Sequence, residues 1–448
     1  MTHKPTGDTI PQTADGGGLY RRKLVASMAL TLVGGACMVE NENGSLTVPL
    51  ADHVVPATGP VPVVPKSKVP AQPADHSPML LLVGPGNPYP QITDAGERLV
   101  QLWGAHPAAP VHIVISPAPP RHYENDFDTY SRRWSKRPAW PPYHGILQGP
   151  VVIEGEPGKV APDLVTDGYG DGVLYYQKGA WVTGAFDATF RHLNFDGFRR
   201  QDGYGNYAAV RIEPAAANAA PHTILFDDVR IGGPMGCDNG LMGGDGITEL
   251  VIRNSEFLLN GSGTGLTHNI YIGSIAKLIL DRVYSHDVRV GHLAKSRALR
   301  TIIRNTRLLD RKGSASYCLD VPNGGHLDVD GLVTEKGASA SNAASIHFSG
   351  ESQVFHPSSI RIRNWTMLGV PTNGTPFGGP GGLFNASGQG DAQSGPGSAL
   401  AVPDIQGTRV FGVDPARLYW AGNFRPLPDA GLVMLAAMPA LNTARLRL

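Results

Sequence analysis

Four residues able to do acid–base chemistry recur along the chain at nearly equal intervals. Tyr271, Lys295, Asp320 and His347 are separated by 24, 25 and 27 residues, and each lies in the middle of a short strand-like segment. Together they offer a phenol, an amine, a carboxylate and an imidazole. If the fold brings them together, such a set can remove one proton, donate another and hold a charged substrate.

Further polar residues accompany these four at matching positions of the same repeat. Arg211 occupies the equivalent place in an earlier segment, Glu213 and Arg297 flank the segments, and His268, His292 and Tyr317 precede them. We divide the candidates by expected role. The catalytic candidates are Lys295, Arg297, Tyr271, His292 and Asp320. The substrate-binding candidates are Arg211, Glu213, His268, Asn269, Tyr317, Asn323 and His347.

The elements that position these residues form two series of short strands. The first series comprises residues 209–213, 269–273, 293–297, 318–322 and 345–349. The second comprises residues 251–254, 278–281, 302–305, 328–331 and 361–364. A period of about 25 residues with two strands per period predicts an all-β, single-stranded right-handed parallel β-helix, a solenoid with one coil per period. Leucine-rich repeats would need a Leu-rich consensus, and propeller blades need about 40 residues.

The strand patterns also predict which side chains face the core. In the first series the inward rows are Ile270, Ala294, Leu319 and Ile346, and Ile272, Ser296, Val321 and Phe348. Because adjacent coils lie about 4.8 Å apart, the outward polar residues should converge within roughly 15 Å. In the second series we expect an inward row of Ile252, Ile279, Ile303, Val329 and Ile362, and an outward row of Arg253, Leu280, Arg304, Asp330 and Arg363. A corner row should hold Asn254, Asp281, Asn305, Gly331 and Asn364, because Asn, Asp and Gly tolerate left-handed backbone.

Charge and composition argue against two classes of function, nucleic-acid binding and nucleotide binding. The chain has 448 residues, with 38 Lys and Arg against 38 Asp and Glu. A nucleic-acid binder would normally carry an excess of basic residues. No Gly-rich loop opens a helix, as a nucleotide site of the common kind requires. The Gly-rich stretches 232–246 and 260–267 are expected to be loops that border the outward row.

The N-terminal region has the features of an export signal. Arg21-Arg22-Lys23 precedes an apolar run from Leu24 to Ala36, which is too short to span a bilayer and resembles a twin-arginine signal. Cys37 offers a site for a lipid anchor. We therefore expect an exported, periplasmic or extracellular protein without a membrane span. The predicted organisation is a signal at 1–37, a Pro-rich linker at 38–77, the β-helix at 78–425 with a short helix near Asp94–Trp103, and a tail at 426–448.

The remaining two cysteines, Cys237 and Cys318, allow two interpretations. They form a disulfide if the fold brings them together, or else they are small buried apolar side chains. Their spacing matches no metal-binding signature.

A family resemblance adds an expected chemistry. Its residues are His268-Asn-Ile-Tyr-Ile-Gly273, the stretch from Gly291 to Ala298, and Asp320-Val-Pro-Asn-Gly-Gly325. This region, within about residues 145–370, resembles the pectate-lyase-like superfamily of right-handed parallel β-helix proteins. That superfamily includes polysaccharide lyases, polygalacturonase-type hydrolases and uronan epimerases. The resemblance implies a polysaccharide partner that contains uronic acid. Calcium is an optional cofactor, although no calcium-site motif of the family maps onto this chain.

A polysaccharide lyase is the function that we expect first. β-Elimination from a uronate requires removal of the C5 proton, neutralisation of the carboxylate and protonation of the leaving oxygen. Lys295 or Arg297 could take the proton, Arg211 or Arg297 could hold the carboxylate, and Tyr271 or His292 could protonate the leaving group. An inverting glycoside hydrolase is the alternative, with Asp320 and a second carboxylate from Glu213, Asp245 or Glu351. A non-catalytic exopolysaccharide-binding or surface protein is the third possibility.

Overall fold

The computed structural model of the chain describes the following parts: residues 39–40, 46–47, 78–106, 109–120, 122–123, 147, 149–165, 179–199, 207–214, 219–311, 314–337, 339–340, 344–349, 355–369, 384–386, 402–413, 418–420 and 425–441. The chain divides into two compact units, residues 1–58 and 59–448. In the first, β1 (Val39–Glu40) and β2 (Leu46–Thr47) form an antiparallel pair. The predicted signal, including Cys37, lies outside the described residues, as does most of the predicted linker.

Parallel strands dominate the second unit and form two large sheets. In the described part, sheet 1 contains eight strands: β7 (Gly179–Thr183), β10 (Ala208–Ile212), β13 (Asn239–Gly243), β16 (Ile270–Ile272), β19 (Ala294–Ser296), β21 (Leu319–Val321), β23 (Ile346–Phe348) and β25 (Phe384–Ala386). Sheet 2 contains 18 strands there: β3 (Met79–Val83), β4 (Val111–Ile115), β5 (Val151–Gly155), β6 (Asp163–Val165), β8 (Ala188–Arg191), β9 (Asn194–Asp196), β11 (His222–Asp227), β12 (Arg230–Ile231), β14 (Gly246–Arg253), β15 (Glu256–Leu258), β17 (Ile275–Asp281), β18 (Tyr284–His286), β20 (Arg300–Leu309), β22 (Gly324–Lys336), β24 (Phe355–Gly369), β26 (Asp404–Gln406), β27 (Arg409–Phe411) and β30 (Val433–Met434).

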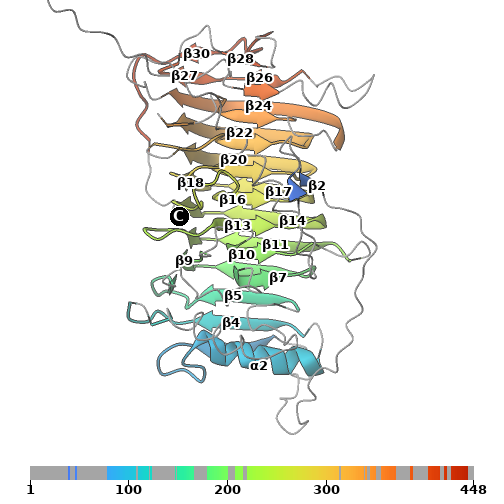
Figure 1. Cartoon of the computed structure of the whole chain (residues 1–448), viewed down its shortest axis with the longest axis vertical. Helices are drawn as coiled ribbons and strands as arrows, with labels where there is room; N and C mark the ends of the chain where they lie inside the picture. The colour runs from blue at the N-terminus through green and yellow to red at the C-terminus, as the bar shows by residue number, and fades with distance from the viewer. Residues whose placement is uncertain are drawn as a thin grey trace, which may run out of the picture. The chain divides into compact units, whose positions relative to one another are not determined.

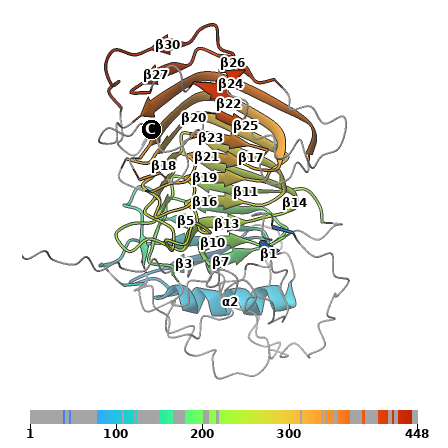
Figure 2. The same cartoon turned by 45° about the horizontal axis from the view of Figure 1, so that its top comes forward.

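From β7 to β25 the chain alternates between the two sheets. After β16 in sheet 1 it forms β17 and β18 in sheet 2 and then returns to sheet 1 as β19, which pairs parallel with β16. Within this unit the strands lie one above another (Figure 1), and the tilted view separates the successive strands of sheet 1, from β7 to β25 (Figure 2). The fold is therefore mostly β with long parallel sheets, an arrangement compatible with a parallel β-helix. A short antiparallel pair, β28 (Tyr419–Trp420) and β29 (Arg425–Pro426), follows β27.

The helix α2 (Ile92–Ala105) lies beside β3, the first strand of sheet 2 along the chain (Figure 2). The helix contributes Ala95, Leu99, Leu102 and Trp103 to the core, and Asp94 accepts the backbone N–H of Gln91 at 3.0 Å where the helix begins. The sequence prediction of a short helix at 94–103 is thus confirmed.

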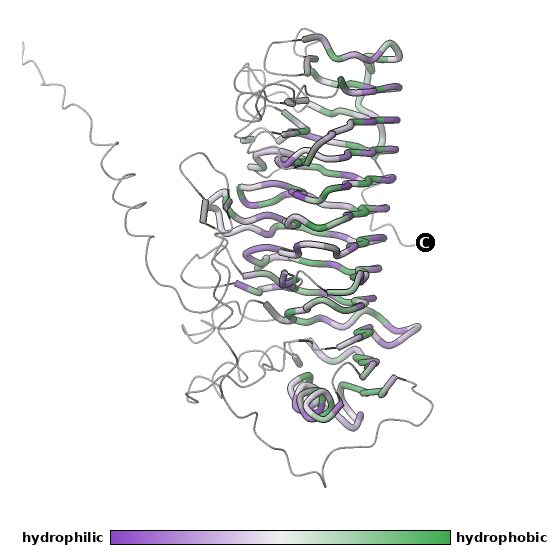
Figure 3. The backbone as a smooth tube through the Cα atoms, turned by 90° about the vertical axis from the view of Figure 1, so that its right-hand side faces the viewer, coloured by the Kyte–Doolittle hydropathy of each residue, from purple (hydrophilic) through white to green (hydrophobic). Residues whose placement is uncertain are grey.

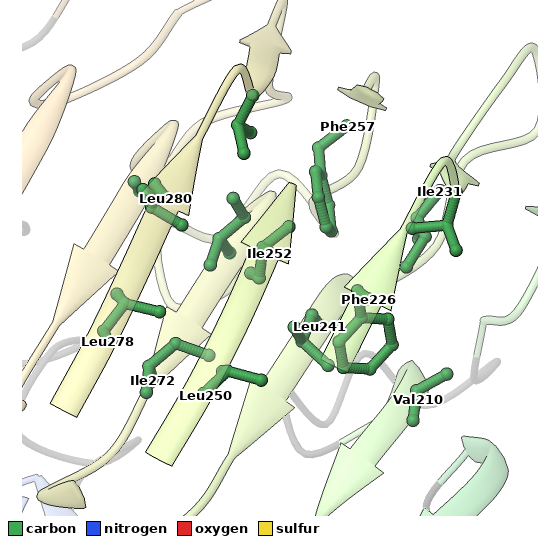
Figure 4. Close-up of a cluster of buried hydrophobic side chains, with 14 of the residues drawn as sticks. Val210, Phe226, Ile231, Leu241, Leu250, Ile252, Phe257, Ile272, Leu278 and Leu280 are labelled. Carbon is green, nitrogen blue, oxygen red and sulfur yellow. The ribbon is translucent and has the colours of Figure 1, made fainter. Parts of the chain in front are cut away.

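The core lies between the two sheets. Val210, Leu241 and Ile272 of sheet 1 face Phe226, Ile252 and Leu280 of sheet 2 (Figure 4). The predicted inward rows of sheet 1 are confirmed, because Ala294, Leu319 and Ile346 pair in register and are at most 1% exposed. Hydrophilic residues recur along the same edge in successive layers (Figure 3).

The corner between the two legs of sheet 2 is built from left-handed residues, as predicted. Asn254, Asn305, Gly331 and Asn364 all have positive φ, between 47° and 78°. The prediction is wrong in one coil. There the left-handed residue is Arg282 (φ 53°), not Asp281.

A shift of one residue in the register that we predicted for β17 explains that error. Leu278 pairs with Leu250, so Leu280 faces the core and Ile279 faces out, opposite to our prediction. Asp281 takes the outward place assigned to Leu280. The run Leu278-Ile-Leu is apolar throughout, and it lacks the alternation that would fix its register.

Three further expectations need correction. The stretch 232–246 is not simply a loop, because it contains β13, which pairs with both β10 and β16. Parallel pairing in sheet 2 continues to β30, beyond the predicted domain end at residue 425. Cys237 and Cys318 are both free and buried, so the possible disulfide is absent.

Candidate functional site

The predicted polar residues of sheet 1 do form one row. Tyr271 pairs with Lys295, Lys295 with Asp320, and Asp320 with His347, each on the neighbouring strand. Towards the N-terminus the row continues through Met242 to Arg211. Sequence reasoning missed Met242, because β13 was not recognised.

The row faces away from the core but is not a solvated face. Strand residues alternate in direction, and the flanking Ile270, Ile272, Leu319 and Val321 all belong to the core. The four acid–base side chains should therefore point outward. Nevertheless Asp320 is 1% exposed, Tyr271 4%, and Lys295 and His347 6% each. Charges at this depth need partners.

Asp320 is the point on which these partners converge. Its Oδ1 accepts a hydrogen bond from Nδ1 of His347 at 2.7 Å. Its Oδ2 lies 3.1 Å from Nζ of Lys295 and 3.3 Å from Nε2 of His292. Burial by itself raises the pKa of the Asp320 carboxyl, but Lys295 and the hydrogen bond from His347 help to hold it well below its usual range. Asp320 is therefore a permanent anion at neutral pH.

A column of rings stands beside this carboxylate. His268 stacks on His292 at 4.7 Å between ring centroids, His292 on Tyr317 at 5.3 Å, and Tyr317 on His347 at 4.6 Å. The three rings that sequence analysis placed before the strands thus lie next to one another. They help to shield Asp320 from water. We call Tyr271, Lys295, Asp320 and His347, with the rings His268, His292 and Tyr317 and with Arg297 and Asn323, the Asp320 cluster.

Backbone hydrogen bonds fix the proton positions on two histidines. The N–H of Tyr317 donates to Nδ1 of His292 at 3.2 Å, and the N–H of His292 donates to Nδ1 of His268 at 3.0 Å. An accepting Nδ1 carries no proton, so the neutral ring holds it on Nε2. Burial, together with Lys295, lowers the pKa of His292 to about 3, and burial lowers that of His268 well below its usual value. Neither ring is an imidazolium acid at neutral pH, so the geometry disfavours His292 as the proton donor.

Tyr271 lies beside two cations of the neighbouring strand segment. Nε of Arg297 donates to its hydroxyl oxygen at 3.4 Å, and Nη1 of Arg297 donates to Oδ1 of Asn323 at 2.6 Å. The Arg297 guanidinium lies 6.0 Å and Nζ of Lys295 5.8 Å from the Tyr271 ring centroid. Both groups come from β19 or the residue that follows it, and they place positive charge beside the phenol ring.

Arg211 and Glu213 form a separate end of the row. Nε of Arg211 donates to Oε1 of Glu213 at 2.8 Å, and its Nη1 lies 3.6 Å from the Met242 sulfur. Three strand steps separate Arg211 from Lys295, or about 14 Å at the usual spacing. This pair can contact a long substrate but not the same atoms as Lys295.

Other candidates are not brought to the cluster. Asn269 is 0% exposed and points inward, where its amide donates to Ser285 and to the carbonyls of Phe257 and His286. The side chain of Asn269 therefore lies apart from the outward row and links strand segments from within. Asp245 accepts the backbone N–H of Gly246 at 2.8 Å and is only partly buried. Glu351 lies outside the described residues.

The described residues contain neither a metal-binding cluster nor a helix that could cross a membrane. Among them, no group of three or more His, Cys, Asp or Glu is arranged to hold a metal ion. In the same part of the chain, no helix is both long and apolar enough to cross a bilayer. The chain matched no protein-family model, no curated protein and no solved structure.

Proposed function

We propose that the chain is an exported right-handed parallel β-helix enzyme that cleaves an acidic polysaccharide by β-elimination. The observation that carries the proposal is the Asp320 cluster. One buried anion holds Lys295 beside Tyr271, whose hydroxyl accepts an Arg297 N–H. A phenol beside a guanidinium and an amine beside a buried carboxylate suit removal of one proton from a substrate and delivery of another.

The contacts favour particular roles. The ion pair with Asp320 keeps a proton on Lys295 in the resting site, so Lys295 neutralises the substrate carboxylate and protonates the leaving oxygen. This mechanism requires Tyr271 to enter the reaction as a phenolate, which accepts the Arg297 N–H and takes the C5 proton. The C5–H electron pair becomes the new carbon–carbon double bond as the C4–O bond breaks. Transfer of the proton from Tyr271 to Lys295 then restores the resting state.

The geometry gives less support to the two alternatives. An inverting hydrolase needs one protonated carboxyl and one carboxylate about 6.5–9.5 Å apart. The pKa of Asp320 is too low for the acid, and Glu213 is engaged with Arg211 at the far end of the row. A binding protein would present open aromatic faces to sugars, whereas Tyr317 is stacked between His292 and His347.

The decisive experiment is incubation of the purified protein with a panel of uronic-acid polymers and with neutral polymers as controls. We expect ultraviolet absorbance from an unsaturated product with at least one anionic polymer and none with the neutral ones. New reducing ends without that absorbance would favour the hydrolase. Binding without any product would favour the exopolysaccharide-binding protein.

A further inference from the structure

Two buried charged residues contact the segment of the chain that leads into the Asp320 cluster. Lys336, the last residue of β22, and Asp310 are both 0% exposed. Nζ of Lys336 donates to the carbonyl of Ser316 at 2.5 Å and to that of Ala315 at 3.4 Å. Oδ2 of Asp310 accepts the backbone N–H of Ala315 at 2.9 Å. These two side chains fix a short segment that belongs to neither large sheet, and we call them the Lys336 clamp.

The clamped segment leads directly into the ring column. The N–H of Ser316 donates to the carbonyl of Gly291, and the next N–H, that of Tyr317, donates to Nδ1 of His292 at 3.2 Å. The Tyr317 ring then lies between His292 and His347. A displacement of this segment would therefore remove the bond that defines the His292 tautomer.

We propose that Asp310 and Lys336 are positioning residues that keep His292 in the tautomer whose Nε2–H faces Asp320. They act through Ala315 and Ser316 and touch neither substrate nor reacting atoms. Any effect of Asp310 and Lys336 on catalysis rests on the proposed function. The tautomer itself is a property of the resting protein and is measurable without any substrate.

The electrostatics of the pair support this role. Burial raises the pKa of Asp310 to about 6 and lowers that of Lys336. Lys336 favours the ionised form of Asp310, as do the backbone N–H groups of Ala315 and Gly337. Asp310 in turn favours the protonated form of Lys336, after Cys318. Asp287 faces Asp310, Cys318 faces Lys336, and Glu335 lies near Asp310. Loss of either charge should weaken the hold on Ala315 and Ser316.

The test combines nitrogen-15 NMR of histidine-labelled protein with amide hydrogen exchange. Lys336→Met removes the donor while keeping the length of the side chain, and Asp310→Asn removes its counter-charge. Lys277→Met is the matched control, because Lys277 pairs with Glu249 at 2.7 Å on the outer face of sheet 2. In both clamp variants we expect His292 to become a mixture of tautomers and the Tyr317 amide to exchange at least about tenfold faster. The Val329 amide in β22 should be unchanged, and the control should match the wild type.

The outcomes separate this inference from the proposed function. If Lys336→Met does not fold, the test of the inference rests on Asp310→Asn alone. An unchanged His292 tautomer and unchanged Tyr317 exchange in a folded clamp variant would overturn the inference, whatever the enzyme activity. A tautomer change in a protein that cleaves no uronan would support the inference and refute the lyase. In an active lyase we expect the clamp variants to lower kcat more than they raise KM.

Discussion

Two rows of charged residues run across adjacent strands of this molecule, and they differ chiefly in burial. On the outer face of sheet 2, Asp227, Arg253, Asp281, Arg304, Asp330 and Arg363 occupy equivalent places on successive strands. Arg253 contacts Asp227 at 2.8 Å with side-chain exposures of 42% and 14%. On sheet 1, Lys295 and Asp320 are 3.1 Å apart with exposures of 8% and 2%.

The comparison shows that alternating charges on neighbouring strands do not by themselves mark a site. In the sheet 2 row, arginines pair with nearby aspartates in water, and such pairs contribute about 0–1 kcal/mol. In the sheet 1 row three donors, Lys295, His292 and His347, converge on one buried carboxylate. Removal of one partner from such a group costs about 3–5 kcal/mol. The predictions below measure this difference.

Lys295 should give the largest effect. If the chain is a lyase, Lys295→Ala should lower kcat by a factor of about 100 to 10,000, as loss of an acid–base group does. Lys295→Arg should keep the positive charge but recover little of the rate, because arginine stays protonated and cannot deliver a proton to the leaving oxygen. Recovery of most of the rate would instead limit Lys295 to neutralising the substrate carboxylate. Lys277→Ala, on the exposed face, should have wild-type kcat.

Removal of the central carboxylate should lower stability most. Asp320→Asn leaves Lys295, His292 and His347 without their shared partner, at a cost of about 3–5 kcal/mol in urea unfolding at neutral pH. The folded-state pKa of Asp320 lies below its unfolded value, so its stabilisation is present above about pH 4 and is lost as the pH falls. The gap between wild type and variant should therefore narrow on acidification. A constant gap would contradict the assigned charge.

The corner of sheet 2 should tolerate glycine at Asn305 but not a bulky aliphatic side chain. Asn305 has φ of 47°, and Asn305→Leu should cost about 1–3 kcal/mol of unfolding free energy. Asn305→Gly, which accepts that backbone, is the matched control and should stay within about 1 kcal/mol of wild type. Catalytic activity should be retained in both. A folded Asn305→Leu protein without activity would give the corner a role that we do not assign to it.

The exposed row should give the smallest effect. Arg253→Ala removes the partner of Asp227, whose pKa is lowered although burial opposes this, because Arg253 and Asn254 donate to it. We expect a loss of at most about 1 kcal/mol, smaller still at high salt. Thermal unfolding in low and high salt measures both. A loss near that of Asp320→Asn would erase the distinction between the two rows.

The sequence predicted the strands best where apolar and polar residues alternate. Segments around Ile270, Ala294, Leu319 and Ile346 were placed in the correct register, because a one-residue error would have put charges in the core. The slip at Leu278 occurred where three apolar residues follow one another. β13 was missed because Asn239-Gly-Leu-Met-Gly243 carries two glycines, which are rare in strands.

The sequence predicted which residues form the candidate site, but it did not predict how deeply they are buried. The common spacing identified Tyr271, Lys295, Asp320 and His347. Their burial depends on rings and loops from several coils, which strand periodicity does not describe. An outward strand residue ordinarily contributes little to folding, whereas the burial of Lys295 beside Asp320 predicts a measurable cost when it is removed. Lys336 gave no sequence signal, because a lysine at the end of a strand usually lies in solvent.

The register of sheet 1 has a consequence for how such a chain can change over evolutionary time. Each strand contributes one residue to the row. An insertion or deletion of one whole repeat therefore adds or removes one residue of the row. Deletion of Ile270 to Leu293 would remove one such unit and leave the pairing pattern of the neighbours intact, with Met242 now beside Lys295. Duplication of the same unit would insert a second tyrosine at that point. The order of chemical groups along the row can thus be rearranged without redesign of the core.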